Sequence, residues 1–437
     1  MLDLMQVLKA SAGLPVKDND SRLIGELLRD RPIVYGWHVD PNISDPYNAV
    51  TYLADAVGKA PAKMGASTFD YGDWQDAFFM PRPCMLRYDG KVAYYLDPND
   101  YTKKADGSSS DVANDNFDGN AMMEWPLIWY KFQAGAADGE GYFYCSNKQI
   151  DSSYKCWCNV NANNEIIPHF YTAIYNGTGT SRLRSLSGVR LTQANGSGYT
   201  TAEQEITRAL SNNTTEDVQW YTDIFSDRIL INALLVLMGK SLSVSNVFGK
   251  GVGAGSSLIP ENYVTGALND KGLFFGTFTG NNAVKVFGME NWYGLMWRRT
   301  AGIMTDTNDL TYYKFTYGTA DGSTVIGYSE QGTGYLTASS SSATGWVTKI
   351  DYSNGLPIPK SVTGGITQDY SGSYYGCYYY NKPSASTGSG LMTRALFGGA
   401  YDPNSSRKSI AHTATLNMDS SNNGAFNVTT GLSCKPI

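Results

Sequence analysis

Cysteine and histidine are the residue types in this chain best suited to nucleophilic or metal-binding chemistry, and both are sparse. The six cysteines include one close pair, Cys156 and Cys158, with a single tryptophan between them. A metal site or a disulfide could use that pair, but neither a second pair nor a nearby histidine accompanies it. The three histidines, His38, His169 and His412, match no metal-ligand spacing. We therefore predict small buried thiols and no metal site at these residues.

Glycine-rich and oxygen-rich segments are the other patterns that could bind a nucleotide or a cation. The segment 249–255 lacks the residue order of a phosphate-binding loop. The segment 111–119 has Asp and Asn at several positions and ends in glycine, like part of a calcium loop, but it lacks the glutamate at position twelve. A solvated loop is the favoured interpretation. No pair of carboxylates stands out for hydrolysis, so we predict no catalytic residue and no cofactor.

Composition favours a binding surface over nucleic-acid binding. Charged residues make up only 17% of the chain, and it holds 31 tyrosines. Tyrosine supplies rigid amphipathic contact area, while Ser and Asn supply adaptable hydrogen bonds, as in antibody paratopes. A β-rich scaffold with Tyr and Thr on pleated surfaces explains the same composition equally well. The net charge of −6 and the scattered Lys and Arg argue against a nucleic-acid partner.

Two further features bear on location. The longest apolar stretch, 229–238, is too short to cross a bilayer. The N-terminal residues lack the positive charge that begins a signal peptide. We therefore expect synthesis in a cytoplasm and no membrane insertion.

The helices expected from apolar spacing are few. One lies near the N-terminus, and one covers 201–210 with Thr201 as its N-cap. A third covers 223–238 and ends at Gly239 as C-cap. Because that third helix is apolar around most of its circumference, we expect it to be buried.

The strands expected from the sequence begin at Ile33. The dipeptide Asp89-Gly90 predicts a hairpin that joins 85–88 to 91–95. A further strand region covers 122–132, where Pro126 indicates an edge or a bulge. Beyond Gly239 the chain consists of strand and loop patterns, which together with the helices indicates an α+β fold.

Several segments resemble motifs of a known fold. The run 287–298 resembles the central motif of the C-type-lectin-like fold shared by formylglycine-generating enzymes and phage tropism determinants. The run 394–401 resembles another strand of that fold, and 431–437 resembles the closing strand of many phage tail proteins. Segments between Tyr35 and Gly58 resemble a module at the front of phage tail and prophage surface proteins. The resemblance covers most of the chain.

This resemblance implies a bacteriophage tail protein with a C-terminal C-type-lectin-like domain. The domain would have one buried helix and a loop-rich antiparallel sheet. The implied divisions are a helical N-terminal segment (1–32), a β-rich attachment or oligomerisation domain (33–115) and a receptor-binding domain (116–437). Trp292 and Trp297 would lie in the core. The framework of the last strands would comprise Arg394, Gly398, Gly399, Leu416, Phe426, Gly431 and Leu432.

In diversified relatives of that fold, the exposed positions near the C-terminus vary while the framework holds. The resemblance assigns receptor binding here to Tyr401, Asp402, Asn404, Ser405, Arg407, Lys408, His412, Asp419, Ser420, Asn422, Asn423 and Asn427. Tyr378 and Tyr380 would add an aromatic wall beside them. Ordinary turn formation explains about half of these loop residues equally well, and sheet packing is an equal explanation for the tyrosines.

The function expected from the resemblance is a virion tail-fibre or tail-tip adhesin. It would be a homo-oligomer, such as a trimer, that binds a host cell-surface receptor and other tail proteins. A structural tail or decoration protein without receptor contact is the alternative. One branch of the resembled fold oxidises cysteine with a reactive cysteine pair near the closing strands, where Cys377 and Cys434 stand alone here. We therefore expect no enzyme activity.

Overall fold

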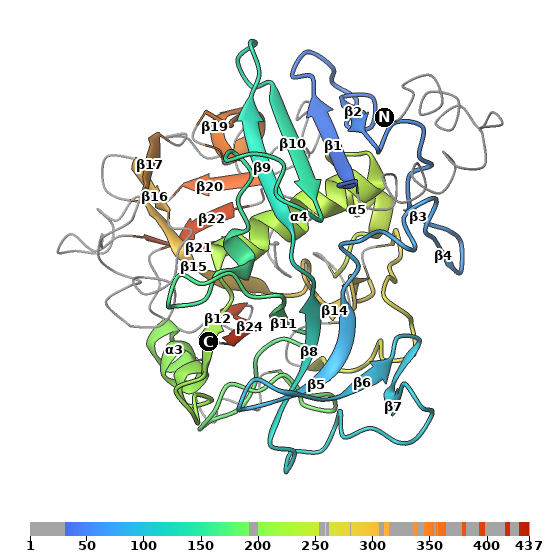
Figure 1. Ribbon diagram of the computed structural model, residues 1–437, viewed down its shortest axis with the longest axis vertical. Coiled ribbons are helices and arrows are strands. Elements are labelled where there is room, and N and C mark those ends of the chain that lie inside the picture. The colour runs from blue at the N-terminus through green and yellow to red at the C-terminus, as the bar shows by residue number, and fades with distance from the viewer. Residues whose placement is uncertain are drawn as a thin grey trace, which may run out of the picture.

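A computed structural model gives the fold of the chain (Figure 1). The residues that it describes are 31–191, 200–252, 258, 262–279, 281–305, 310–313, 336–339, 345–353, 355, 357–363, 378–381, 393–397, 416–419 and 428–436. The helix predicted near the N-terminus lies outside these residues. Among the described residues strands are many and helices few.

Two sheets consist mainly of strands from the first half of the chain, and the larger of them also contains the last strand. The four-stranded sheet has the order β2 (Val50–Ala54), β1 (Val34–Val39), β10 (Gly141–Ser146) and β9 (Trp129–Ala134). The seven-stranded sheet has the order β12 (Val218–Thr222), β24 (Leu432–Pro436), β11 (Phe170–Ala173), β8 (Gly119–Trp125), β5 (Arg82–Arg87), β6 (Val92–Asp97) and β7 (Asp100–Lys104). All neighbouring strands in both sheets are antiparallel.

The nine-stranded sheet comes from the second half of the chain. Its order is β17 (Leu336–Ser339), β16 (Leu310–Tyr313), β15 (Trp297–Thr305), β21 (Thr393–Phe397), β22 (Leu416–Asp419), β20 (Tyr378–Asn381), β18 (Gly345–Asp351) and β19 (Ile358–Thr363), and β23 (Val428–Thr429) also pairs with β15. The expectation of an antiparallel sheet holds for most of it. The exceptions are the parallel pairs β20–β22 and β15–β23. A two-residue hairpin turn cannot join parallel strands, so these pairs need long connections.

The remaining elements are short ladders and helices. The ladders are β3 (Lys63–Met64) with β4 (Phe69–Asp70), and β13 (Lys285–Val286) with β14 (Met289–Glu290). The helices are α3 (Ala202–Leu210), α4 (Phe225–Gly239), α5 (Val244–Phe248) and the 3₁₀ turn η1 (Trp157–Asn159). Within the part of the chain that is described, no helix is long and apolar enough to span a membrane.

The helix α4 is buried along its whole length, as its sequence predicts. Figure 1 shows it running behind β9 and β10, and the indole Nε1 of Trp37 on β1 donates to its Ala233 carbonyl at 3.1 Å. The predicted C-cap is displaced by one residue. Gly239 is the last helical residue, and Lys240 takes the left-handed conformation with φ of 48°. This helix packs against both the four-stranded and the nine-stranded sheet.

Two local predictions are confirmed by the backbone. Thr201 caps α3, and its side chain and that of Gln204 form a reciprocal capping box. The predicted hairpin is β5–β6, and Gly90 in its turn has a φ of 78°. Glycine adopts that conformation without the steric cost that other residues incur.

The predicted strand region over 122–132 is divided next to Pro126, where the sequence indicated an edge or a bulge. The strand stops at Trp125, and β9 begins at Trp129 in a different sheet. Proline has no amide hydrogen to donate, and Pro126 begins the three-residue break between the sheets. Each half then pairs separately, β8 with β5 and β11, and β9 with β10.

Strands on both sides of the predicted boundary at 115/116 are hydrogen-bonded to each other. β1 pairs with β10 in the four-stranded sheet, and β5 pairs with β8 in the seven-stranded sheet. One apolar core includes Trp37 and Trp74 from the first part, and Phe143 and Leu234 from the second. Residues 33–104 and 119–146 therefore belong to the same sheets, and a division at 115/116 would cut through them.

Candidate binding site

The strands that carry the predicted binding residues are neighbours in the nine-stranded sheet. β22 pairs with β21 on one side and with β20 on the other. Asp419 ends β22, and Tyr378 and Tyr380 lie in β20, where the backbone alone is described. The sheet therefore brings together three strands that are up to 41 residues apart in sequence.

The other predicted binding residues lie outside the described residues. They are Tyr401, Asp402, Asn404, Ser405, Arg407, Lys408, His412, Ser420, Asn422, Asn423 and Asn427. Of the predicted framework, Gly398, Gly399 and Phe426 also lie outside them. Arg394, Leu416, Gly431 and Leu432 are placed, in or next to strands β21, β22 and β24.

The register of β21 and β22 separates the predicted residues into two groups. Phe397 lies opposite Leu416, and Arg394 lies opposite Asp419. The segment 398–415 thus joins the two strands at the Phe397 end, while 420–427 follows Asp419 at the other end. Three residue steps along a strand span roughly 10 Å. The predicted residues therefore do not all adjoin the same end of these strands.

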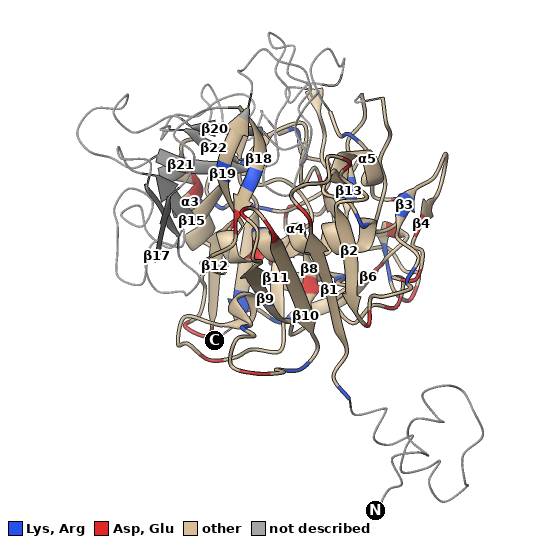
Figure 2. Ribbon diagram, turned by 90° about the horizontal axis from the view of Figure 1, so that it is seen from above, with Lys and Arg blue, Asp and Glu red and all other residues tan. Residues whose placement is uncertain are grey.

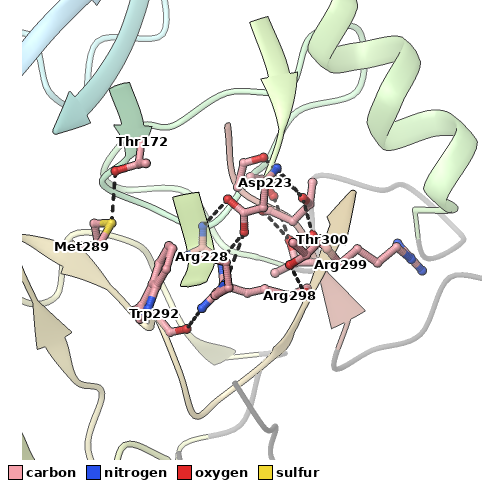
Figure 3. Close-up of polar contacts among 12 residues, drawn as sticks. Thr172, Asp223, Arg228, Met289, Trp292, Arg298, Arg299 and Thr300 are labelled. Atoms are coloured by element: carbon pink, nitrogen blue, oxygen red, sulfur yellow. Dashed lines mark hydrogen bonds and ion pairs between the residues drawn. The ribbon is translucent and has the colours of Figure 1, made fainter. Parts of the chain in front are cut away.

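A buried ion cluster fixes the strand beside β21. Asp223 accepts two hydrogen bonds from the Arg298 guanidinium of β15, from Nε at 2.7 Å and from Nη2 at 3.0 Å. Arg228 of α4 lies on the other side of the same carboxylate, with Nη2 at 3.5 Å from Oδ2. Figure 3 shows Asp223 pointing toward both arginines. The two hydrogen bonds from Arg298 make a bidentate pair with Asp223, which is the strong form of an Arg–carboxylate interaction.

Trp292 closes one side of this cluster. The Arg228 guanidinium lies 3.5 Å from its ring centroid, and Arg228 Nη1 donates to the Trp292 carbonyl at 2.8 Å. The indole Nε1 donates to Asn232 Oδ1 of α4 at 2.9 Å. Trp292 is therefore in the core, as predicted. Trp297, the first residue of β15, is only half-buried, so its assignment to the core is corrected.

A second ion pair holds the next residue of β15. Arg299 Nη1 lies 2.6 Å from Glu205 Oε2 of α3, and both side chains are buried. Burial raises the pKa of Glu205, and the charge of Arg299 opposes that rise. Successive residues of β15 thus point to opposite sides, one toward α4 and the other toward α3.

The last strand is anchored to α4 by a third buried pair. Asp227 Oδ2 accepts from the Ser433 hydroxyl at 2.7 Å, and Lys435 Nζ lies 3.3 Å from Asp227 Oδ1. Lys435 and Asp227 are both almost wholly buried. Burial raises the pKa of Asp227, against the effect of Lys435. β24 therefore ties the seven-stranded sheet to the helix that carries Arg228.

Thiol chemistry is disfavoured at the described cysteines. Cys84, Cys145, Cys156, Cys158 and Cys434 are buried and unbridged, which confirms the prediction of buried thiols for these five. Burial raises the pKa of each thiol, so the reactive thiolate is suppressed. Cys377 lies outside the described residues.

The oxygen-rich segment 111–119 makes local contacts. Asp111 accepts hydrogen bonds from the Tyr94 hydroxyl at 2.9 Å and from the Asn114 amide at 3.0 Å. These bonds lower the pKa of Asp111, with that from Asn114 the larger cause. The carboxylate therefore organises a turn against β6.

The buried charges were not found by pattern analysis of the sequence. Asp223 and Arg228 lie close together at the start of α4, but Arg298 is far from them along the chain, and none of the three belongs to a recognised motif of charges. A signal was present, because Asp227 and Arg228 interrupt a helix that is otherwise apolar on nearly every side. Charged residues in such a helix must be paired if they are buried.

No protein-family model matches the chain, and no curated protein is significantly similar to it.

Proposed function

We propose that this chain is a phage tail adhesin, in which a C-type-lectin-like C-terminal region presents loops to a host cell-surface receptor. The receptor-binding residues would be the predicted ones between Tyr401 and His412 and between Asp419 and Asn427, together with Tyr378 and Tyr380 of β20. The protein would act in the virion tail as a homo-oligomer, a trimer by resemblance, bound to other tail proteins.

One observation carries the proposal: the strands next to the proposed loops adjoin a strand fixed by buried ions. β15 pairs directly with β21, and Arg298 and Arg299 hold β15 to Asp223 and Glu205. A loop on a rigid scaffold can change its residues without loss of the fold. A rigid scaffold of this kind suits a binding surface whose residues vary.

The composition of the loops supports binding to a surface with many copies of the receptor. Loops rich in Tyr, Asn and Ser make polar, wet and individually weak contacts. Several copies in one oligomer raise the avidity by about 10²–10⁴ without new contacts. A trimeric adhesin would gain from this effect, whereas a decoration protein would have no need of it.

Binding to intact bacteria tests the proposal. The probe is the fluorescently labelled full-length protein on a panel of bacterial strains. Two variants divide the proposed site as the strand register divides it: Tyr401→Ala with Arg407→Ala, and Asn423→Ala alone. We expect binding to at least one strain and a loss of about tenfold or more for the double variant.

A matched control carries Tyr47→Ala and Lys91→Ala, which change an exposed tyrosine and an exposed cation elsewhere. The control should bind like the unchanged protein. Binding that survives all three loop substitutions combined would reject the proposed face. If no strain is bound while the protein is folded and oligomeric, the structural role in the tail is the better account.

A further inference from the structure

The outer face of the four-stranded sheet is a second surface with a chemistry of its own. Side chains alternate along its strands, so that Trp37, Phe132 and Phe143 point to α4 and are buried. The alternate residues face the other way and, apart from Gly36 and Ser146, are half-buried or exposed. Figure 1 shows β1, β9 and β10 in front of α4, and Figure 2 shows the same sheet from a direction at 90°.

The register of this sheet places the outward residues in two rows. One row has Lys131 of β9, Tyr144 of β10, Gly36 of β1 and Leu53 of β2 side by side. The next row has Gln133, Tyr142, His38 and Thr51 in the same order of strands. Aromatic rings thus occupy the centre, and groups that form hydrogen bonds surround them.

Gly36 makes room for the ring of Tyr144. A Cβ atom at Gly36 would lie 2.7 Å from Tyr144 Cδ1 and 3.0 Å from Cε1. The ring therefore leans across the neighbouring strand. Any larger residue at Gly36 would push it away from this position.

Lys131 is a cation between two tyrosine rings. Its Nζ lies 5.4 Å from the ring centroid of Tyr144 and 4.8 Å from that of Tyr154. Its one hydrogen bond is to the Ser153 hydroxyl at 3.3 Å. Among the described residues no carboxylate lies within ion-pair distance of it. Asp151 accepts from the same Ser153 hydroxyl, which is the main cause of its lowered pKa, and the charge of Lys131 adds to that effect. Because Lys131 has no direct carboxylate partner among the described residues, an anionic ligand can still bind its ammonium.

The second row is polar and already organised. His38 Nε2 and the Tyr142 hydroxyl contact Glu140 Oε1 at 2.8 and 2.9 Å. The His38 and Tyr142 rings lie 4.6 Å apart at an interplanar angle of 30°. The Ala137 amide also donates to Glu140, to Oε2 at 2.9 Å, so this carboxylate is held by three partners. Gln133 and Thr51 are exposed at the two ends of the row.

We propose that this face binds an acidic oligosaccharide, with a sugar carboxylate on Lys131 and a sugar ring against Tyr144. A pyranose has C–H faces that pack on an aromatic ring and a rim of hydroxyls for Gln133, Tyr142 and Thr51. A carboxylate on Lys131 gains a charge-assisted hydrogen bond. An acidic peptide is a poorer match to the centre of this face, because extended peptides dock on unpaired strand edges and Tyr144 lies on β10, which is paired on both sides. Lys131 lies on the edge strand β9, but the neighbouring Tyr130 is already hydrogen-bonded there to the backbone of Lys155.

Titration with defined oligosaccharides tests this site on the full-length protein. The probes are tri-galacturonic acid, neutral maltotriose and a short poly-glutamate peptide, each followed by calorimetry and tryptophan fluorescence. We expect tri-galacturonic acid to bind, more weakly as salt is added, because exposed charge pairs are screened. Lys131→Gln should lower its affinity about tenfold or more, since the charged hydrogen bond is lost.

Three further variants separate the charge from the ring. Lys131→Arg keeps the charge and should retain binding, while Tyr144→Ala should lose it and Tyr144→Phe should keep it. Lys91→Ala removes an exposed lysine on the β5–β6 turn and should have no effect. Circular dichroism checks that each variant is folded.

Two outcomes would overturn the inference. One is that tri-galacturonic acid does not bind, or binds equally well to Lys131→Gln. The other is that poly-glutamate binds through Lys131 and the sugar does not, which would assign the face to an acidic peptide. Neither outcome depends on the loops of the nine-stranded sheet, so this test and the test on bacteria can fail separately.

Discussion

Asp223 is a buried carboxylate that faces two guanidinium groups. One negative charge there balances two positive ones, and water is excluded from all three side chains. Burial is the main reason that the pKa of Arg228 is lowered, and the charge of Arg298 adds to it. The face of the Trp292 ring and the Trp292 carbonyl partly offset the excess positive charge. Removal of the carboxylate would leave two like charges facing each other.

The first prediction is that Asp223→Asn destabilises the fold strongly. The loss expected is about 3–5 kcal/mol in the free energy of unfolding, as for other buried pairs that lose one partner. Urea unfolding measures it. Asp115→Asn is the control, since that side chain is 91% exposed and its change should stay within about 0.5 kcal/mol. Equal midpoints for the two variants would contradict the account of the cluster.

The second prediction concerns Gly431, which packs directly on the same pair. A Cβ atom there would overlap Arg298 Nη2 and lie 2.5 Å from Asp223 Oδ1. Gly431→Ala should therefore separate the pair and cost about 3–5 kcal/mol, again measured by urea unfolding. Gly107→Ala serves as comparison, because no atom lies within 4 Å of its Cβ and its φ of 86° costs only about 1–2 kcal/mol of backbone strain. The idea fails if the two changes cost the same.

At the scale of elements, two hairpins from different sheets meet at one carboxylate. Asp138 lies between β9 and β10 and contacts Lys349 of β18 and Lys360 of β19, both at 2.8 Å. Tyr352, between β18 and β19, packs against Phe132 of β9 with a centroid distance of 6.5 Å. The contact therefore combines an exposed ion pair with a buried aromatic one.

The third prediction is a pH dependence of this contact. Hydrogen bonds from Lys349 and Lys360 lower the pKa of Asp138 to about 2, below the value of about 3.9 for an unfolded aspartate. A depressed carboxyl pKa stabilises the fold above the unfolded value, and that stability is lost as the pH falls from about 4 to about 2. The difference in Tm between the unchanged protein and Asp138→Asn should be positive near neutrality and vanish in this window.

Salt provides the check on that difference, because an exposed pair is screened at high ionic strength. Asp89→Asn is a control at a looser exposed pair, in which the Asp89 carboxylate lies 3.7 Å from Lys91 Nζ. A Tm difference for Asp138→Asn that persists unchanged to pH 2 would show that the charge does not hold the hairpins together.

At the scale of the whole molecule, the sheets interleave early and late parts of the chain. β24, at the C-terminus, lies between β11 and β12, and β1, near the start of the described residues, lies between β2 and β10. Neither half can complete its hydrogen-bonded ladders without the other. Cooperative unfolding of the whole core is therefore expected.

The fourth prediction follows from this arrangement. A fragment of residues 116–437 should lack a cooperative thermal transition, because β8 loses β5 and β10 loses β1. Co-expression with 33–115 should restore the transition, because association of the two fragments re-forms the pairs β5–β8 and β1–β10. Calorimetry of the full chain gives the reference. A fragment 116–437 that melts cooperatively by itself would instead support the boundary at 115/116.

Local patterns in the sequence were enough to predict the features that neighbouring residues decide. The capping box at Thr201, the turn at Gly90 and the burial of α4 each depend on residues within one or two turns of the chain. Apolar spacing also indicated a β-rich second half. The strand region over 122–132 was predicted, but its apolar run gives no sign that its halves enter different sheets.

The sequence by itself determined the local elements and the scarcity of accessible chemistry, since turns, caps and amphipathic spacing act over a few residues. Only the tertiary structure decided that Asp223 meets Arg228 and Arg298, and that β22 lies between β21 and β20. It also decided which residues share the outer face of the four-stranded sheet. Pairings between distant strands depend on the burial of the whole core, which no local pattern in the chain encodes.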